Sequence, residues 1–117
     1  MIADPRRLKA ILKKFNTCIP LFIAMGDECR QQLLLDIAQA GTAGINVSTL
    51  TEKSHLSRPA ISYHLKMLKD SGLVKPFKKG TQIFYSISKS KNYIAFKEVL
   101  TSFDDLIQQI ENDAEEI

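Results

Sequence analysis

The stretch at residues 56–74, LSRPAISYHLKMLKDSGLV, limits the possible fold more than any other part of the chain. Ser57 is a natural N-cap, and Pro59 is tolerated in a first helical turn because its missing N–H would have no partner there. Gly72 suits the left-handed position that closes many helices. These signals predict a helix from Ser57 to Ser71. Its one narrow buried face, at spacing i, i+4 and i+7, consists of Ile61, Leu65 and Leu68.

The opposite face of this helix is unusual for a helix that only fills a core. It presents small hydroxyl groups and cations, and its N-terminal half carries the positive end of the helix dipole. The major groove of DNA admits one helix, and short polar groups and arginine read its base edges. Arg58 is placed to reach guanine edges, and Lys66 to contact the backbone. The predicted DNA contacts on this helix are Ser57, Arg58, Pro59, Ser62, Tyr63 and Lys66.

The flanking segments predict a helix–turn–helix followed by a β-hairpin. A short strand is expected at 45–47, and a short helix from Ser48 or its neighbour to about Ser54. Residues 73–77 and 82–87 are rich in β-branched and aromatic residues, with KKGT between them as the turn. Pro76 predicts that the first of these strands lies at a sheet edge. Next to a groove-reading helix, this hairpin is expected to contact the DNA backbone or minor groove, whereas alone it would suit a solubilising turn. Its predicted contacts are Lys78, Lys79 and Gln82.

Charge is distributed unevenly along the chain. The net charge is only +3, but residues 52–91 carry nine basic and two acidic groups. Residues 92–117 carry one basic and seven acidic groups. A basic segment that coincides with a groove-reading helix indicates a polyanion partner, which we predict to be double-stranded DNA.

The N-terminal quarter is predicted to be helical. Asp4 and Pro5 begin a first helix, and Asn16 or Thr17 is expected to cap a second that ends near residue 25. Asp27 is expected to cap a third helix.

The C-terminal segment at 90–114 reads as one long helix. Its apolar residues are spaced 3-4-3-4, the pattern of a two-heptad seam, and the stripe is broader than one small domain needs. We therefore expect it to mediate dimerisation. The predicted contacts are Phe96, Val99, Leu100, Phe103, Leu106, Ile107 and Ile110. A two-fold dimer would place two reading helices about 34 Å apart and would select a palindrome.

Together, GDECRQQLLLDI and LSRPAISYHLKMLKDSGLVKPFKKGTQIFYSIS resemble the ArsR family of winged-helix transcriptional repressors. The shared pattern is a D-x-x-R helix start, an S-x-x-A-[VI]-S-x-H-L-K-x-L recognition helix, a G-L-V strand entry and a wing ending in aromatic residues. The resemblance covers about residues 16–110. It implies a symmetric dimer that binds an operator and usually represses transcription. The matching residues are Asp27, Arg30, Ser57, Ala60, Ile61, Ser62, His64, Leu65, Lys66, Leu68, Gly72, Leu73 and Val74.

The sequence thus predicts a mostly α (α+β) chain, a single winged helix–turn–helix domain over 1–117 with a two-stranded wing, extra N-terminal helices and a long C-terminal dimerisation helix. The helix–turn–helix is expected at about 47–72 and the wing at about 73–88. Dimerisation helices are expected at about 5–25 and 90–114. The predicted function is a sequence-specific, homodimeric repressor that binds a palindromic operator.

Other classes of function lack a sequence signal. The longest apolar run, CIPLFIAM at residues 18–25, is too short to cross a bilayer, and no secretory signal is visible. We therefore expect a cytoplasmic protein with reduced thiols and no membrane partner. No Gly-rich phosphate loop or H-E-x-x-H motif indicates an enzyme, and no cofactor is expected.

The inducing signal is not evident from the sequence. The family's common metal sites are missing, because NVSTLTEK contains no C-x-C pair and the terminal helix contains no histidine. We predict no metal ligands, and a structural role for His55 and His64. Two alternatives stay open. Cys18 and Cys29 could form a redox pair or a soft-metal site, although small buried cysteines are commoner; or the winged helix could be a protein-interaction module whose basic face binds an acidic protein.

Overall fold

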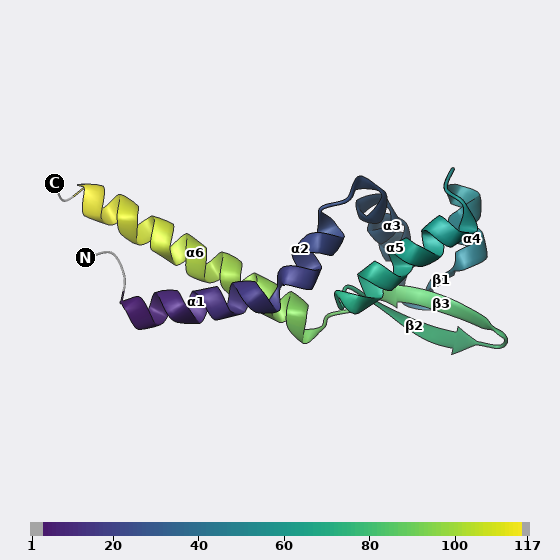
Figure 1. Ribbon diagram of the computed structural model, residues 1–117, viewed down its shortest axis with the longest axis horizontal. Helices are drawn as coiled ribbons and strands as arrows, with labels where there is room; N and C mark the ends of the chain where they lie inside the picture. Colours follow the sequence, from purple (N-terminus) through teal and green to yellow (C-terminus); the bar gives the residue numbers. More distant parts are fainter. Residues whose placement is uncertain (1–3, 116–117) are drawn as a thin grey trace.

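The computed structural model describes residues 4–115, so residues 1–3 and 116–117 of the predicted domain lie outside it. Over the described range, six α-helices, one 3-10 turn and three short strands follow one another along the chain (Figure 1). The fold is mostly helical with a small antiparallel sheet, which confirms the predicted class. The elements are α1 Pro5–Thr17, α2 Ile19–Met25, α3 Glu28–Gln39, η1 Gly41–Ala43, β1 Ile45–Asn46, α4 Val47–Lys53, α5 Arg58–Asp70, β2 Val74–Lys79, β3 Gln82–Ile87 and α6 Lys91–Glu115.

Five of the helices begin at a side-chain cap, and the cap of α6 is the Ser90 hydroxyl, which accepts a hydrogen bond from the Tyr93 N–H at 3.3 Å. The oxygens of Asp4, Asp27, Asn46 and Ser57 each accept a hydrogen bond from a backbone N–H two or three residues further on. The expected caps at Asp4, Asp27 and Ser57 are confirmed. The helix expected to start at Ser48 or its neighbour begins at Val47, where the Asn46 amide oxygen caps it.

The expected cap of the second helix at Asn16 or Thr17 is wrong. The first helix continues through Thr17, whose hydroxyl donates to the Lys13 carbonyl at 3.2 Å. The backbone N–H of Cys18 closes this helix, and α2 then begins at Ile19 without a side-chain cap. The proline at position 20 fits the first turn of α2 because no N–H is needed there.

The sheet has the strand order β1-β3-β2, with both pairings antiparallel. β2 lies at the edge, as Pro76 predicted, and the wing hairpin gains β1 as a third, two-residue strand. β2 runs to Lys79, which pairs with Gln82, so the connection is shorter than the predicted KKGT turn. Gly80 in this two-residue connection has φ 65°, a conformation such hairpins commonly require.

The core lies among α2, α3, α4, α5 and the sheet. Its buried residues include the predicted face of α5, with Ile61, Leu65 and Leu68 at most 1% exposed. Gly72 ends α5 with φ 82°, and a Cβ at this position would lie 2.5 Å from the Ser90 hydroxyl oxygen. Glycine therefore lets the chain turn directly from the helix into β2. We call the part of the molecule formed by residues 19–87 the head.

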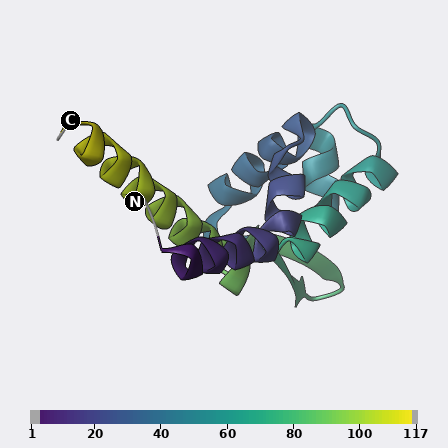
Figure 2. The ribbon, with the colours of Figure 1, turned by 60° about the vertical axis from the view of Figure 1, so that its left-hand side comes forward.

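The remaining helices, α1 and α6, extend away from the head side by side (Figures 1 and 2). This pair, which we call the arm, gives the molecule its long shape of 62 × 23 × 22 Å. Ile11 and Val99 are buried, and an exposed Lys14–Glu98 ion pair of 3.3 Å links the two helices. Among residues 4–115, no helix combines the length and apolarity needed to cross a bilayer.

Candidate nucleic-acid interface

The local chemistry of its sequence holds α5 in place. The Ser57 hydroxyl accepts a hydrogen bond from the Ala60 N–H at 3.3 Å, so the helix begins at Arg58. The buried stripe fixes one side of the helix to the head. All six residues predicted to contact DNA from this helix are exposed, with Tyr63 at 58%. The helix therefore has an anchored side and a free polar side.

Arg58 connects the two helices of the helix–turn–helix. One of its guanidinium nitrogens donates to the Ser48 hydroxyl on α4 at 3.3 Å, and both groups are exposed. In the intervening turn, the Ser54 hydroxyl accepts a hydrogen bond from the Leu56 N–H at 2.9 Å. These contacts hold the N-terminal tip of α5 beside α4.

The wing residues are exposed but partly engaged within the chain. The Lys79 ammonium donates to the Ala43 carbonyl at 3.4 Å and lies 5.1 Å from the centre of the Phe84 ring. The Gln82 side-chain oxygen accepts a hydrogen bond of 2.7 Å from the Asn46 amide. This second contact joins the wing to the cap of α4, which fixes the wing relative to the helix–turn–helix.

A hollow lies between α5 and the wing. Its lining is polar and apolar in about equal parts, and it brings three predicted DNA contacts, Arg58, Ser62 and Gln82, to one surface. The lining residues are Asn46, Val47, Ser48, Arg58, Ser62, Thr81, Gln82, Ile83 and Tyr85. The recognition helix and the wing therefore form one continuous candidate interface.

A buried arginine behind α5 was not predicted as part of the site. The Arg30 guanidinium donates to the carbonyls of Ala24 and Ile23 at 2.9 and 3.0 Å and lies 3.2 Å from Nδ1 of His64. The backbone N–H of Arg30 donates to Asp27, and this hydrogen bond lowers the pKa of the carboxyl group. Arg30 thus links α2, α3 and α5. The D-x-x-R pattern marked the residue, but nothing in it indicated these partners.

The two cysteines have different surroundings. Cys18 is fully buried, its thiol contacts the Asn92 carbonyl at 3.8 Å, and burial raises the pKa of the thiol. Cys29 is half-buried and lies with Asp27 and His64. Both thiols are free. From the sequence the two cysteines could form a pair, and nothing in it indicated that Cys29 lies beside His64.

The residues predicted for dimerisation lie along α6. Val99 is buried, and the Phe96 ring packs edge-on against Phe22 of α2 with centroids 5.8 Å apart. Leu106 is half-buried. The others leave large apolar surfaces in water: Leu100 at 55%, Phe103 at 49%, Ile107 at 42% and Ile110 at 48% exposed.

Known proteins share these features. The sequence pattern described as "Bacterial regulatory protein, arsR family" matches residues 45–75, which span β1 to the start of β2. An "Uncharacterized HTH-type transcriptional regulator" of Methanocaldococcus jannaschii is 32% identical over 95 residues, which cover 81% of this chain and all of that protein. The "Transcriptional repressor SdpR" of Bacillus subtilis is 34% identical over 70 residues, 58% of this chain and 72% of that one.

The solved structures show the same architecture. An "ArsR-like Transcriptional Regulator from Rhodococcus sp. RHA1" superimposes with a TM-score of 0.70 and 26% identity, covering 91% of this chain and 97% of that one. The agreement extends over both the head and the arm. The chain belongs to the ArsR family of helix–turn–helix, DNA-binding transcriptional regulators.

Proposed function

We propose that this protein is a homodimeric repressor that places the N-terminal half of α5 in the major groove of a palindromic operator. The main support is the difference between the two faces of α5. Its apolar stripe is buried, while its predicted DNA contacts are exposed. In this proposal the helix–turn–helix at 47–72, the wing at 73–88 and the helices at 5–25 and 90–114 act as one domain.

On α5, Arg58 is the proposed base reader, because its fork of donors matches guanine O6 and N7. Its 3.3 Å bond to Ser48 is exposed and can be exchanged for a base contact. Ser57 and Ser62 carry hydroxyls that can bond to bases or phosphates. Tyr63, beside them, is proposed to contact a phosphate, with Pro59 packing at the groove edge. Lys66 lies further along the helix and is proposed to neutralise a phosphate.

From the wing, Lys78 and Lys79 are proposed to contact the neighbouring backbone or minor groove. Gln82 lies in the same hollow as Arg58, which supports one surface shared by helix and wing. Because Lys79 already contacts a carbonyl and an aromatic ring, its direction is partly fixed before DNA arrives. Such preorganisation reduces the side-chain entropy lost on binding.

The arm supports the dimer. Exposed leucine and isoleucine side chains lie on both of its helices and on the adjoining α2. Leu12 on α1 is 59% exposed, and Ile23 on α2 is 53% exposed. A monomer rarely leaves so much clustered apolar surface in water. A two-fold partner that covers these residues would orient two copies of α5 toward successive major grooves.

The proposal includes no inducer at the family's common metal sites. The described part of α4 reads VSTLTEK and α6 carries no histidine, so neither offers the usual nitrogen and sulfur donors. A redox role for Cys18 and Cys29 remains a hypothesis. DNA affinity of the oxidised protein tests it, with Cys18→Ser and Cys29→Ser as controls, and equal affinity throughout would end it.

The proposed function is tested by footprinting on the DNA upstream of the protein's own gene, followed by binding titrations over a range of salt. We expect protection of a palindrome and an affinity that falls linearly on a double-logarithmic salt plot. Arg58→Ala is expected to relax sequence preference, at about 1–3 kcal/mol for the base it reads. Lys79→Ala should weaken all sequences alike and reduce the salt slope by about 1.

A charge-matched control is Lys9→Ala, an exposed lysine on α1 that lies outside the proposed DNA surface. This variant should keep both affinity and salt slope. Transcription from the footprinted promoter should fall when the protein is added. Activation instead would refute repression, and absence of duplex binding at low salt would favour an acidic protein partner for the basic face.

A further inference from the structure

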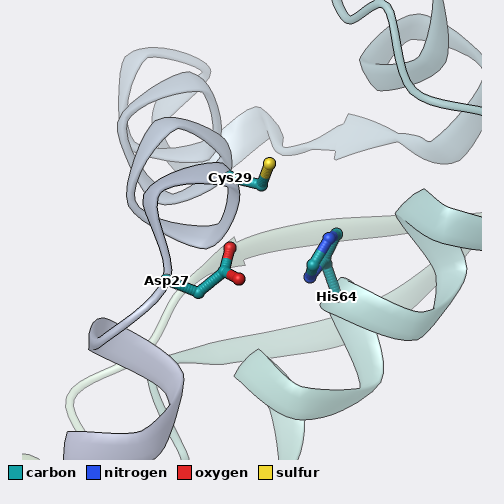
Figure 3. A group of neighbouring side chains, drawn as sticks. All are labelled: Asp27, Cys29 and His64. Atoms are coloured by element: carbon teal, nitrogen blue, oxygen red, sulfur yellow. The ribbon is translucent and has the colours of Figure 1, made fainter.

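Three side chains with metal-binding atoms meet behind the recognition helix. Asp27 and Cys29 come from the start of α3, and His64 comes from the middle of α5 (Figure 3). Their potential ligand atoms all lie within 4.8 Å of one another, and all three residues are half-buried. These residues lie outside the two usual metal sites of the family, which fall on α4 and α6.

The donor set is selective. One imidazole nitrogen, one thiolate and one carboxylate suit Zn²⁺ or Cd²⁺, whereas Mg²⁺ and Ca²⁺ prefer sites built from oxygen alone. Tetrahedral bonds of about 2.0–2.3 Å would place the ligand atoms about 3.5 Å apart. The cluster therefore needs to close by roughly 1 Å from its present spacing, which side-chain rotation and a small helix movement can supply.

Local charge is compatible with a divalent cation. An ionised Asp27 and a Cys29 thiolate together balance the two positive charges of the metal. The Arg30 guanidinium, 3.2 Å from Nδ1 of His64, adds a positive charge beside the cluster, and two backbone carbonyls already accept hydrogen bonds from it.

Metal binding and the Arg30–His64 hydrogen bond exclude each other. A guanidinium can only donate, so Nδ1 of His64 must accept and its Nε2 carries the proton. A neutral imidazole that binds a metal keeps one N–H, which cannot face another donor. The metal must therefore separate His64 from Arg30, while Arg30 retains its bonds to Ala24 and Ile23.

We infer that Asp27, Cys29 and His64 form a binding site for a soft divalent cation of the Zn²⁺ or Cd²⁺ class, with its fourth position open to water. Occupation of the site draws α5 toward the start of α3. This movement is directed into the protein and away from the exposed face of α5. Given the proposed function, on which this last step rests, the metal lowers operator affinity by about tenfold or more.

Titration of the reduced, metal-free protein with Co²⁺ tests the site directly. We expect one ion per protomer with a thiolate-to-cobalt charge-transfer band, displaced by Zn²⁺. Cys29→Ser should abolish the band. Asp27→Asn should weaken binding about tenfold or more, although asparagine preserves the helix cap. Cys18→Ser is the matched thiol control and should bind like the wild type.

The inference fails if no band develops, if Cys29→Ser binds as well as the wild type, or if Cys18→Ser loses the band. Operator binding is measured separately, on the same samples with and without metal. Unchanged operator affinity in the cobalt-loaded protein would refute the regulatory step. Absence of operator binding by the metal-free protein would refute the proposed function and leave the metal titration standing.

Discussion

The head and the arm contain similar proportions of apolar residues but use them differently. The contiguous buried core consists of head residues, among them Leu21, Ile37, Leu50 and Leu65. In the arm, Ile11 and Val99 are buried, while Leu12, Leu100 and Phe103 are about half exposed or more. The head buries most of its large hydrophobic side chains within itself, whereas the arm leaves many of its own exposed, as one side of a protein–protein interface does. The difference supports the proposed dimer, in which a second copy of the chain would cover the arm.

The largest effect that tests this difference between head and arm is expected in the core of the head. Leu68 is fully buried, so Leu68→Ala leaves a cavity and should cost about 2–5 kcal/mol of unfolding free energy. Urea unfolding followed by circular dichroism measures the loss. The loss should not vary with protein concentration.

The matched arm variant is Leu12→Ala, which removes the same atoms from a side chain that is 59% exposed. Its effect should depend on concentration, vanishing in dilute protein and appearing where the dimer is populated. Equal, concentration-independent losses in both variants would contradict the proposed division between head and arm.

The second largest effect is expected from a charge in the arm. Phe103 is 49% exposed on α6, and Phe103→Glu would place an unpaired carboxylate in the proposed dimer interface. The cost of burying such a charge should raise the dimer dissociation constant about 100-fold or more. Sedimentation equilibrium measures the change, with Asp104→Asn, at an exposed neighbour, as the control. A wild-type protein that is monomeric at high concentration would refute the dimer.

Features that depend on neighbouring residues in the sequence were predicted, whereas contacts between distant segments were not. The limits of α5 were evident because its cap, its apolar stripe and Gly72 all act within one segment. The start of α4 agrees with the prediction, but its cap at Asn46 was not identified, because Ser48, two residues later, is an equally good capping residue. Arg30 had a recognisable motif, but its partner His64 is 34 residues away. Such a contact depends on how α3 and α5 pack, which periodicity alone does not determine.

The cysteines illustrate the same limit. Two thiols in one sequence suggest a pair, yet Cys18 contacts Asn92 and Cys29 lies beside His64. The chemistry of Cys29 depends on a helix that the chain reaches only later. The sequence therefore identified Cys29 as a possible ligand, but it did not reveal that Asp27 and His64 lie beside it.

A smaller effect separates folding from DNA binding in the head. Ser57→Ala removes the cap of α5 and should lower stability by about 1 kcal/mol. Ser57→Asp keeps a capping oxygen and places a negative charge at the positive end of the helix, so stability should be maintained. The same charge faces phosphates in the proposed complex and should weaken operator binding at least tenfold. Thermal unfolding and DNA titration measure the two effects, and equal DNA affinity of Ser57→Asp and wild type would remove Ser57 from the interface.

The smallest effect compares a cap in the head with a cap in the arm. Hydrogen bonds to Arg30 and Arg6 lower the pKa values of Asp27 and Asp4 from their ordinary value of 3.8. A lowered pKa means that the ionised form stabilises the fold, so the contribution is complete above pH 3.8 and is lost as pH falls through the lowered value. Asp27→Asn should therefore reduce the loss of global unfolding free energy that occurs as the pH falls. Asp4→Asn should leave that loss unchanged in dilute protein, because the start of α1 can fray without opening the head. Urea midpoints measured from pH 6 down to pH 2.5 distinguish these outcomes, and an equal reduction by both variants would mean that the arm unfolds together with the head.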